Sequence, residues 1–192
     1  MPQLPLTAVY LDFESPECDR VWSWLSTTAA RGEVEVRPFW NQSALAGSRQ
    51  GPWERSAPTS GLELLALAEF ARERGRDVHL GLVDAAFAVL HGESADATGL
   101  ELWLAIGGRA GLDMAAFTAD VERWRAEVGL WHAEARDELG VTAVPTLVFG
   151  ERTAVYVELD EPVTDPTAAM ALLGQVAALA DCPVRELRRT SG

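Results

Sequence analysis

The stretch Glu138-Leu139-Gly140-Val141-Thr142-Ala143-Val144-Pro145-Thr146-Leu147-Val148-Phe149 carries most of the information about the fold. Gly140 is typical of the residue just after a helix, because glycine readily adopts the left-handed backbone conformation used there. The apolar run Ala143–Phe149 predicts a strand. Pro145 stands near the start of this strand, where the missing backbone N–H is tolerated. The stretch therefore predicts a helix, a turn that contains a proline, and a buried strand.

A second stretch, Tyr10-Leu11-Asp12-Phe13-Glu14-Ser15-Pro16-Glu17-Cys18, predicts a strand that leads into a helix. Ala8–Phe13 is short and rich in β-forming residues, as buried strands are. Ser15, Pro16 and Glu17 suit the N-cap, the first position and the first turn of a helix. A cysteine, Cys18, follows in that first turn.

The rest of the chain alternates between strand and helix patterns. Residues 41–60 have no apolar period and predict a loop, with a short helical turn near Trp53. Residues 60–139 are predicted to be nearly all helical. The further predicted elements are a first helix that ends at Gly32, strands at Val34–Phe39 and Thr153–Leu159, helices at Glu63–Arg74 and Leu100–Arg109, amphipathic stripes at Leu80–Leu90 and Met114–Val128, and a final helix at Thr167–Ala180.

This order of elements, with its two motifs, resembles the DsbA-like branch of the thioredoxin superfamily. The resemblance implies an α/β, thioredoxin-like fold with an all-helical insertion. It places the thioredoxin-like domain at residues 1–56 and 137–192, and the insertion at residues 57–136. In that family the bond before the proline that corresponds to Pro145 is cis. The cis bond exposes the backbone of Val144, with which an extended peptide could pair as an added strand.

The second motif departs from the family pattern of C-P-x-C, because Ser15 replaces the first cysteine. A dithiol oxidoreductase attacks with the first thiolate and resolves the mixed disulfide with the second thiol. Cys182 is expected at the far end of the last helix, on the order of 20 Å from the site. A disulfide needs Cα atoms within about 7 Å. We therefore expect no dithiol cycle, and we expect Cys18 alone to be a weak nucleophile.

The resemblance leaves several functions open. The first is a thiol–disulfide oxidoreductase-like protein with a degenerate S-P-E-C active site, and the second is an isomerase or transferase that depends on a thiol cofactor. Kappa-class glutathione transferases and 2-hydroxychromene-2-carboxylate isomerases are similar in fold and have serine at the first position. By that likeness, Ser15 would bind a low-molecular-weight thiol of the glutathione or mycothiol type. A third hypothesis is a non-catalytic module that binds an extended peptide beside the proline. A fourth is that Ser15 simply caps its helix.

The candidate site residues follow from these hypotheses. Ser15 and Cys18 are the catalytic candidates, and Pro16, Val144 and Pro145 are the candidates for binding a substrate or thiol. No tightly bound cofactor and no metal are expected, because the three histidines, His79, His91 and His132, are too scattered for a metal site.

Further residues are also of interest. Asp12 is either a carboxylate buried under the site or a residue at the surface end of a strand. Trp40 and Trp53 bracket the irregular loop, which is expected to border the site, and one of them either lines a pocket or covers the core. His132 is the histidine with the strongest claim to a role there, although the sequence does not favour one.

The composition and the charge of the chain limit the kinds of partner that we expect. The net charge of −13 disfavours nucleic acid, because such a surface repels phosphate backbones. The N-terminal residues do not resemble a signal peptide, and no apolar run is long enough to span a bilayer. The expected location is therefore the cytoplasm and the expected partner a small thiol or an extended peptide. The oligomeric state stays open.

Overall fold

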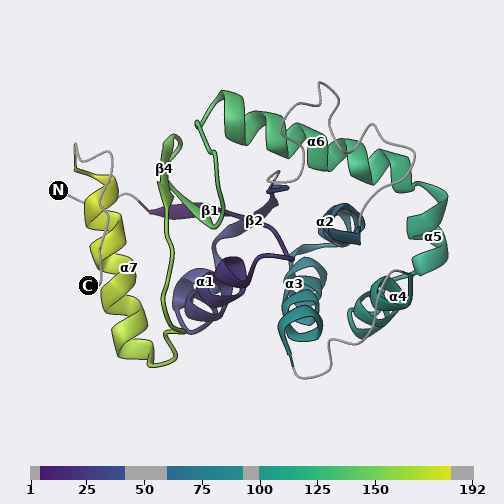
Figure 1. Ribbon diagram of the computed structural model, residues 1–192, viewed down its shortest axis with the longest axis horizontal. Coiled ribbons are helices and arrows are strands. Elements are labelled where there is room, and N and C mark those ends of the chain that lie inside the picture. Colours follow the sequence, from purple (N-terminus) through teal and green to yellow (C-terminus); the bar gives the residue numbers. More distant parts are fainter. Residues whose placement is uncertain (1–4, 42–59, 93–99, 183–192) are drawn as a thin grey trace.

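The computed structural model describes residues 5–41, 60–92 and 100–182. Its elements follow the expected order of strand, helix, strand, helical block, two strands and helix (Figure 1). They are β1 (Leu6–Leu11), α1 (Pro16–Ser26), the 3-10 helix η1 (Ala29–Gly32), β2 (Glu35–Pro38), α2 (Ser60–Glu73), α3 (Arg76–His91), α4 (Leu100–Arg109), α5 (Met114–Ala119), α6 (Val121–Asp137), β3 (Thr146–Phe149), β4 (Thr153–Tyr156) and α7 (Pro166–Ala180). Residues 138–145 connect α6, the last helix of the block, to β3.

The sheet has the strand order β2-β1-β3-β4. Strand β1 pairs in parallel with β2 and antiparallel with β3, and β3 pairs antiparallel with β4. The carboxyl ends of β1 and β2 therefore lie at the same edge of the sheet as the start of β3. Both sequence motifs lie at this edge.

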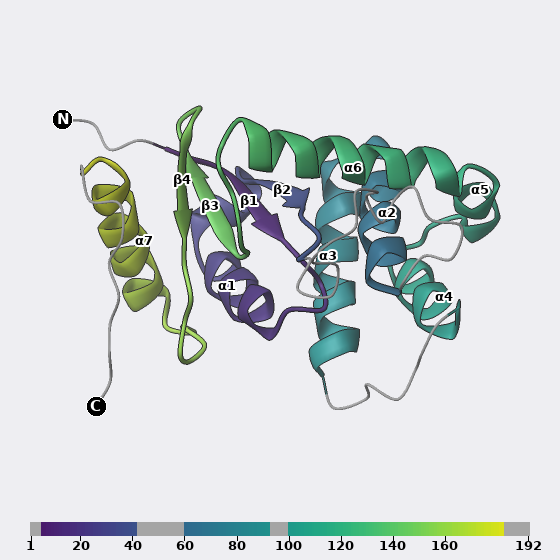
Figure 2. The same cartoon turned by 45° about the horizontal axis from the view of Figure 1, so that its top comes forward.

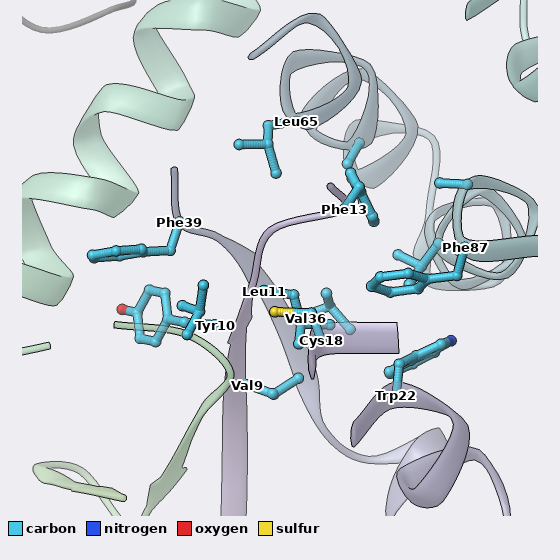
Figure 3. Packing of buried hydrophobic residues seen from close by; sticks show 14 of the residues in the cluster. Val9, Tyr10, Leu11, Phe13, Cys18, Trp22, Val36, Phe39, Leu65 and Phe87 are labelled. Carbon is cyan, nitrogen blue, oxygen red and sulfur yellow. The ribbon is translucent and has the colours of Figure 1, made fainter. Parts of the chain in front are cut away.

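Helices cover both faces of the sheet. In Figure 2, α1 lies on one side of the strands, and α6 runs out of the helical block and ends beside the strands on the other side. Helix α7 packs beside β4, and the indole Nε1 of Trp24 in α1 donates to the carbonyl of Ala169 in α7 at 2.9 Å. These helices enclose the apolar core, part of which appears in Figure 3.

Helix α2 lies at the centre of the helical block and is buried from Gly61 to Phe70. Two glutamates on it, Glu63 and Glu69, are buried as well. Each is paired with an arginine: Glu63 with Arg125 of α6, and Glu69 with Arg72. The pairing fits the rule that buried charges need partners.

The first helix ends earlier than expected, at Ser26 rather than Gly32. Thr27 and Thr28 follow, and their hydroxyls donate to the carbonyls of Trp24 and Leu25 at 2.8 Å. Threonine side chains that bond to the backbone in this way offer the chain an alternative to continuing the helix. The residues up to Gly32 form η1 instead.

The stripe Met114–Val128 was expected to be one helix, but it is divided into α5 and α6 at Asp120. Asp120 has φ −122° and ψ 24°, outside the helical range. Its carbonyl accepts from the N–H of Arg123, which starts the second helix. The apolar period continues through the break, so periodicity alone does not reveal it. Residues 42–59 of the predicted loop, Trp53 among them, lie outside the described residues.

None of the helices in the described ranges has the length and apolar character needed to cross a membrane.

Candidate functional site

The two motifs meet at one edge of the sheet. Tyr10, near the end of β1, pairs with Thr146, the first residue of β3. The chain then turns, and the N–H of Ser15 donates to the carbonyl of Asp12 at 3.2 Å. The Val144–Pro145 peptide bond, just before β3, is cis. The start of α1 and the cis-proline turn therefore lie at the same end of the strands.

Ser15 is the N-cap of α1, and both hydrogen-bonding roles of its hydroxyl are in use. The oxygen accepts from the backbone N–H of Cys18 at 3.2 Å, and the proton is donated to Oε2 of Glu17 at 2.9 Å. Hydrogen bonds from its own backbone N–H and from Ser15 hold the pKa of Glu17 below its usual range, so this carboxyl is ionised at neutral pH. A hydroxyl has one proton to donate. Ser15 would have to release Glu17 before it could donate to a bound thiolate, and the carboxylate would then repel that thiolate.

Cys18 faces inward from the first turn of α1. Its side chain is fully buried, and its sulfur lies within the packed core cluster of Figure 3. The sulfur accepts a hydrogen bond from the N–H of Asp12 at 3.4 Å. Burial raises the pKa of the Cys18 thiol to about 12. The thiolate is the reactive form of cysteine, so this geometry argues against the catalytic role considered for Cys18 above.

The three binding candidates differ in exposure. Pro16 is exposed at the first position of α1, whereas Val144 and Pro145 are buried. The accessible backbone of the turn lies just upstream, since Thr142 is exposed and Ala143 is half-buried. Val144 was expected to present its backbone outward, but it retains only 3% of its accessible surface. The open part of the turn is therefore at residues 142 and 143.

The backbone N–H groups of Thr142 and Ala143 donate to no other residue in the described parts of the chain. The neighbouring groups are engaged: the N–H of Val141 bonds to the carbonyl of Ala135 at 2.8 Å, and the carbonyl of Ala143 accepts from the Thr146 hydroxyl at 2.7 Å. Gly140, with φ +68°, turns the chain out of α6, as its place in the sequence predicts. The turn thus presents two available backbone N–H donors, and hydrogen bonds hold the residues on either side of them in place.

Asp12 is a buried carboxylate, the first of the two alternatives that its position in the sequence allows. Its oxygens accept from the N–H groups of Glu14 at 3.0 Å and Asn41 at 2.9 Å, which ties the end of β1 to the segment after β2. Burial raises its pKa to about 6, although both hydrogen bonds act in the opposite direction.

A pocket of about 150 Å³ opens beside the turn. Its lining residues come from the end of β2, the last turns of α6 and the turn itself: Phe39, Trp40, His132, Arg136, Val141 and Thr142. Figure 3 shows the ring of Phe39 extending toward α6, where it stacks on His132 with 4.4 Å between ring centroids. Sequence reasoning singled out Trp40 and His132 separately. Their meeting depends on the path of α6 across the sheet, which no local pattern reveals.

Comparison with known proteins gives matches among solved structures only, as no family model and no curated protein matches the chain. A probable DsbA oxidoreductase from Streptomyces coelicolor aligns with a TM-score of 0.60 and 21% identity, over 94% of this chain and 92% of that one. SrgA from Salmonella enterica serovar Typhimurium aligns with a TM-score of 0.55 and 14% identity, over 92% of this chain and 96% of that one. The disulfide oxidoreductase DsbA from Proteus mirabilis aligns with a TM-score of 0.54 and 15% identity, over 93% and 90%.

At these identities the likeness establishes the architecture. The alignments extend over both the sheet with α1 and α7 and the helices between β2 and β3, in agreement with the fold class expected from the two motifs. The chain has a DsbA-like thioredoxin fold with a helical insertion.

Proposed function

We propose that this chain is a redox-inactive member of the DsbA-like fold that binds an extended peptide through the backbone of its cis-proline turn. The observation that carries the proposal is a contrast at one edge of the sheet. The groups that would perform thiol chemistry, at Ser15 and Cys18, are engaged or buried, whereas the N–H groups of Thr142 and Ala143 are available.

The residues at the motif support the proposed absence of dithiol exchange. Ser15 has no sulfur to attack a disulfide, and the thiol of Cys18 is neutral and inaccessible. Cys182, the other cysteine, is exposed just beyond the end of α7. Helix α7 spans Pro166–Ala180, so the chain has moved on the order of 20 Å along it before reaching Cys182.

The thiol-binding alternative is less well supported. It requires the Ser15 proton to point at a ligand sulfur, but that proton is donated to Glu17. The positive end of the α1 dipole, which would favour a thiolate, already faces this ionised carboxylate. Binding glutathione or mycothiol here would therefore bring a second negative charge to a site that is already neutralised.

Peptide binding needs only the backbone of the turn. An extended chain can pair as an added strand with backbone N–H groups that have no partner on an ordered segment. The main-chain hydrogen bonds then supply the affinity. Hydrogen exchange measures this directly. We expect an unstructured peptide to slow exchange at the amides of residues 142 and 143, both in the native chain and in Ser15→Ala.

Two results would overturn the proposal. One is turnover in an insulin-reduction assay by the purified native protein. The other is exchange at residues 142 and 143 that stays unchanged at saturating concentrations of unstructured peptides. Titration with glutathione tests the alternative function of thiol binding, because a ligand at 100 times its Kd would stabilise the fold by about 2.7 kcal/mol.

A further inference from the structure

The pocket beside the turn has apolar walls and a polar rim. Phe39, Trp40 and Val141 are each less than 10% exposed, and His132 is stacked flat against Phe39. Arg136 and Thr142 are exposed at the opening. This combination of an aromatic interior and a few polar groups at the entrance is common in sites that bind small groups.

The size of the pocket sets the size of its occupant. A cavity of roughly 150 Å³ is large enough to hold one benzene ring. The pocket, at about 150 Å³, therefore has room for one aromatic side chain. Aromatic rings pack well against such walls, because offset-stacked and edge-to-face contacts add to the gain from burial.

The rim selects for negative charge. Arg136 makes no ion pair with any residue in the described part of the chain, whereas Arg37, Arg72 and Arg125 are all paired. His132 lies one helical turn earlier on α6, so both side chains share a face of the helix. Burial lowers the pKa of His132 to about 4, which leaves Arg136 as the cation of the pocket at neutral pH.

The acidic neighbours of Arg136 do not cancel this charge. Asp137 is the next residue, so its side chain is turned about 100° around the helix from that of Arg136. Glu138 follows at the C-cap of α6. Both are exposed, and neither lines the pocket.

We propose that this pocket binds the carboxyl-terminal residue of a peptide whose last side chain is aromatic. The ring enters between Phe39, Trp40 and Val141, and the terminal carboxylate pairs with Arg136. The preceding backbone carbonyls accept from the N–H groups of Thr142 and Ala143. The inference rests on the proposed function, because it treats the pocket as the end of the same peptide site.

A peptide end accounts for more of the surface than a free aromatic acid does. A free acid would occupy the ring pocket and Arg136 alone, and the two N–H groups of the turn would stay without protein or ligand partners. A peptide reaches all of these groups together. Thr142 both lines the pocket and carries one of the available donors, so the two parts are continuous.

The test compares four probes by isothermal titration calorimetry. They are N-acetyl-Ala-Ala-Ala-Phe with a free carboxylate, the same peptide as a carboxamide, N-acetyl-Ala-Ala-Ala-Ala with a free carboxylate, and N-acetylphenylalanine. The first is expected to bind most tightly. Removing the carboxylate should weaken binding by at least about tenfold, because one charge-assisted hydrogen bond is lost. Removing the ring should weaken it by a similar factor, because one buried side chain is lost.

Variants assign the effect to the rim. Arg136→Gln is expected to abolish the difference between carboxylate and carboxamide. Arg109→Gln is the matched control, because Arg109 is also exposed and forms no ion pair in the described ranges. It should leave the preference intact.

Each contrary outcome has a defined meaning. Equal binding of carboxylate and carboxamide overturns the inference, and so does a preference that survives in Arg136→Gln. Equally tight binding of N-acetylphenylalanine overturns the assignment to a peptide in favour of a small acid. If the carboxamide slows exchange at residues 142 and 143 as strongly as the free acid does, the proposed function stands and this inference fails. If no probe slows it, both fail.

Discussion

The hydroxyl of Ser15 donates a hydrogen bond to the carboxylate of Glu17 at 2.9 Å while it accepts from the N–H of Cys18. These two bonds form a closed arrangement at the start of α1, in which the serine, the carboxylate and the helix end satisfy one another. The residue at the position of a redox nucleophile therefore serves as a helix cap. The cap is consistent with the proposal that the chain keeps the fold without its thiol chemistry.

If Ser15 serves only as a helix cap, its replacement should change the stability of the fold and leave ligand binding unchanged. Ser15→Ala should lower the free energy of unfolding by about 1 kcal/mol, because the N–H of Cys18 loses its acceptor. Urea unfolding measures the change. Ser26→Ala, at the exposed end of the same helix, is the matched control and should stay within about 0.5 kcal/mol of the native chain. Normal stability together with lost ligand binding in Ser15→Ala would make Ser15 a ligand group instead.

Restoring the missing sulfur tests the geometry of the motif. Side chains three positions apart in a helix lie about 5–6 Å apart at Cβ, so Ser15→Cys should place a new thiol within reach of Cys18. After oxidation with diamide and denaturation, neither thiol should react with an alkylating agent. The Cys182→Ser background removes the exposed cysteine from the count. Two alkylated thiols in that experiment would show that the two positions do not face each other.

Helix α2 was predicted from its apolar residues, but the burial of every residue from Gly61 to Phe70 was not. Local periodicity identifies a helix and one apolar face, whereas Glu63 and Glu69 read as solvent-facing positions in the sequence. Both are buried because α6 brings Arg125 and the Trp131 indole to them. The same limit applies to the pocket. Its six lining residues come from three separate segments, and their meeting is a property of the tertiary path.

The site itself divides in the same way. The motif S-P-E-C identifies the start of α1, the cap at Ser15 and the missing first cysteine, because these depend on neighbours within four residues. The donation from Ser15 to Glu17, the burial of Cys18 and the inward position of Val144 depend on rotamers and on packing against β1. The proposed function rests on those features.

The buried pair Glu63–Arg125 is expected to be strongly coupled. Nε of Arg125 donates to Glu63 Oε1 at 2.7 Å, and both side chains are less than 10% exposed. Arg125→Met should destabilise the fold by about 3–5 kcal/mol, since it leaves the buried Glu63 carboxylate without its partner. Glu63→Leu should destabilise it less, because Arg125 keeps its ion pair with the exposed Glu122. The double variant should recover much of that loss. Urea unfolding of the native chain, the two single variants and the double variant gives a double-mutant cycle. If the effects of the single variants add up to that of the double variant, the pair is not coupled.

An exposed pair supplies the control. Arg123 and Glu73 form an ion pair at 2.7 Å, but both side chains are about half exposed. Breaking it with Arg123→Gln should leave the midpoint of urea unfolding close to that of the native chain, because exposed ion pairs contribute little to stability.

His79 predicts an acid-sensitive step in stability. Burial, reinforced by Arg72 and Arg76, lowers its pKa to about 3. Between that value and about 6.5, the unfolded chain binds a proton at this position that the folded chain does not. Stability should therefore fall as the pH drops through this window. His79→Gln should reduce the loss between pH 7 and 4.5 by on the order of 2 kcal/mol.

Asp12 acts in the opposite direction over part of the same range. Its pKa is raised to about 6, so the folded state holds the extra proton between about pH 4 and 6, and its contribution grows on acidification. NMR titration of the His79 ring protons separates the two groups. A His79 midpoint near 6.5 in the folded protein would contradict the predicted burial effect.

The most direct test of a redox-silent site is the reactivity of Cys18 under native conditions. In Cys182→Ser, Cys18 is the remaining thiol, and the rate of its alkylation by iodoacetamide at pH 8 can be compared with that of free cysteine and of the urea-unfolded variant. Because the thiol is buried and its pKa is about 12, we expect alkylation slower by at least about a hundredfold, limited by opening of the fold. Alkylation in the native protein as fast as that of free cysteine would show an accessible thiolate at the motif and contradict this account.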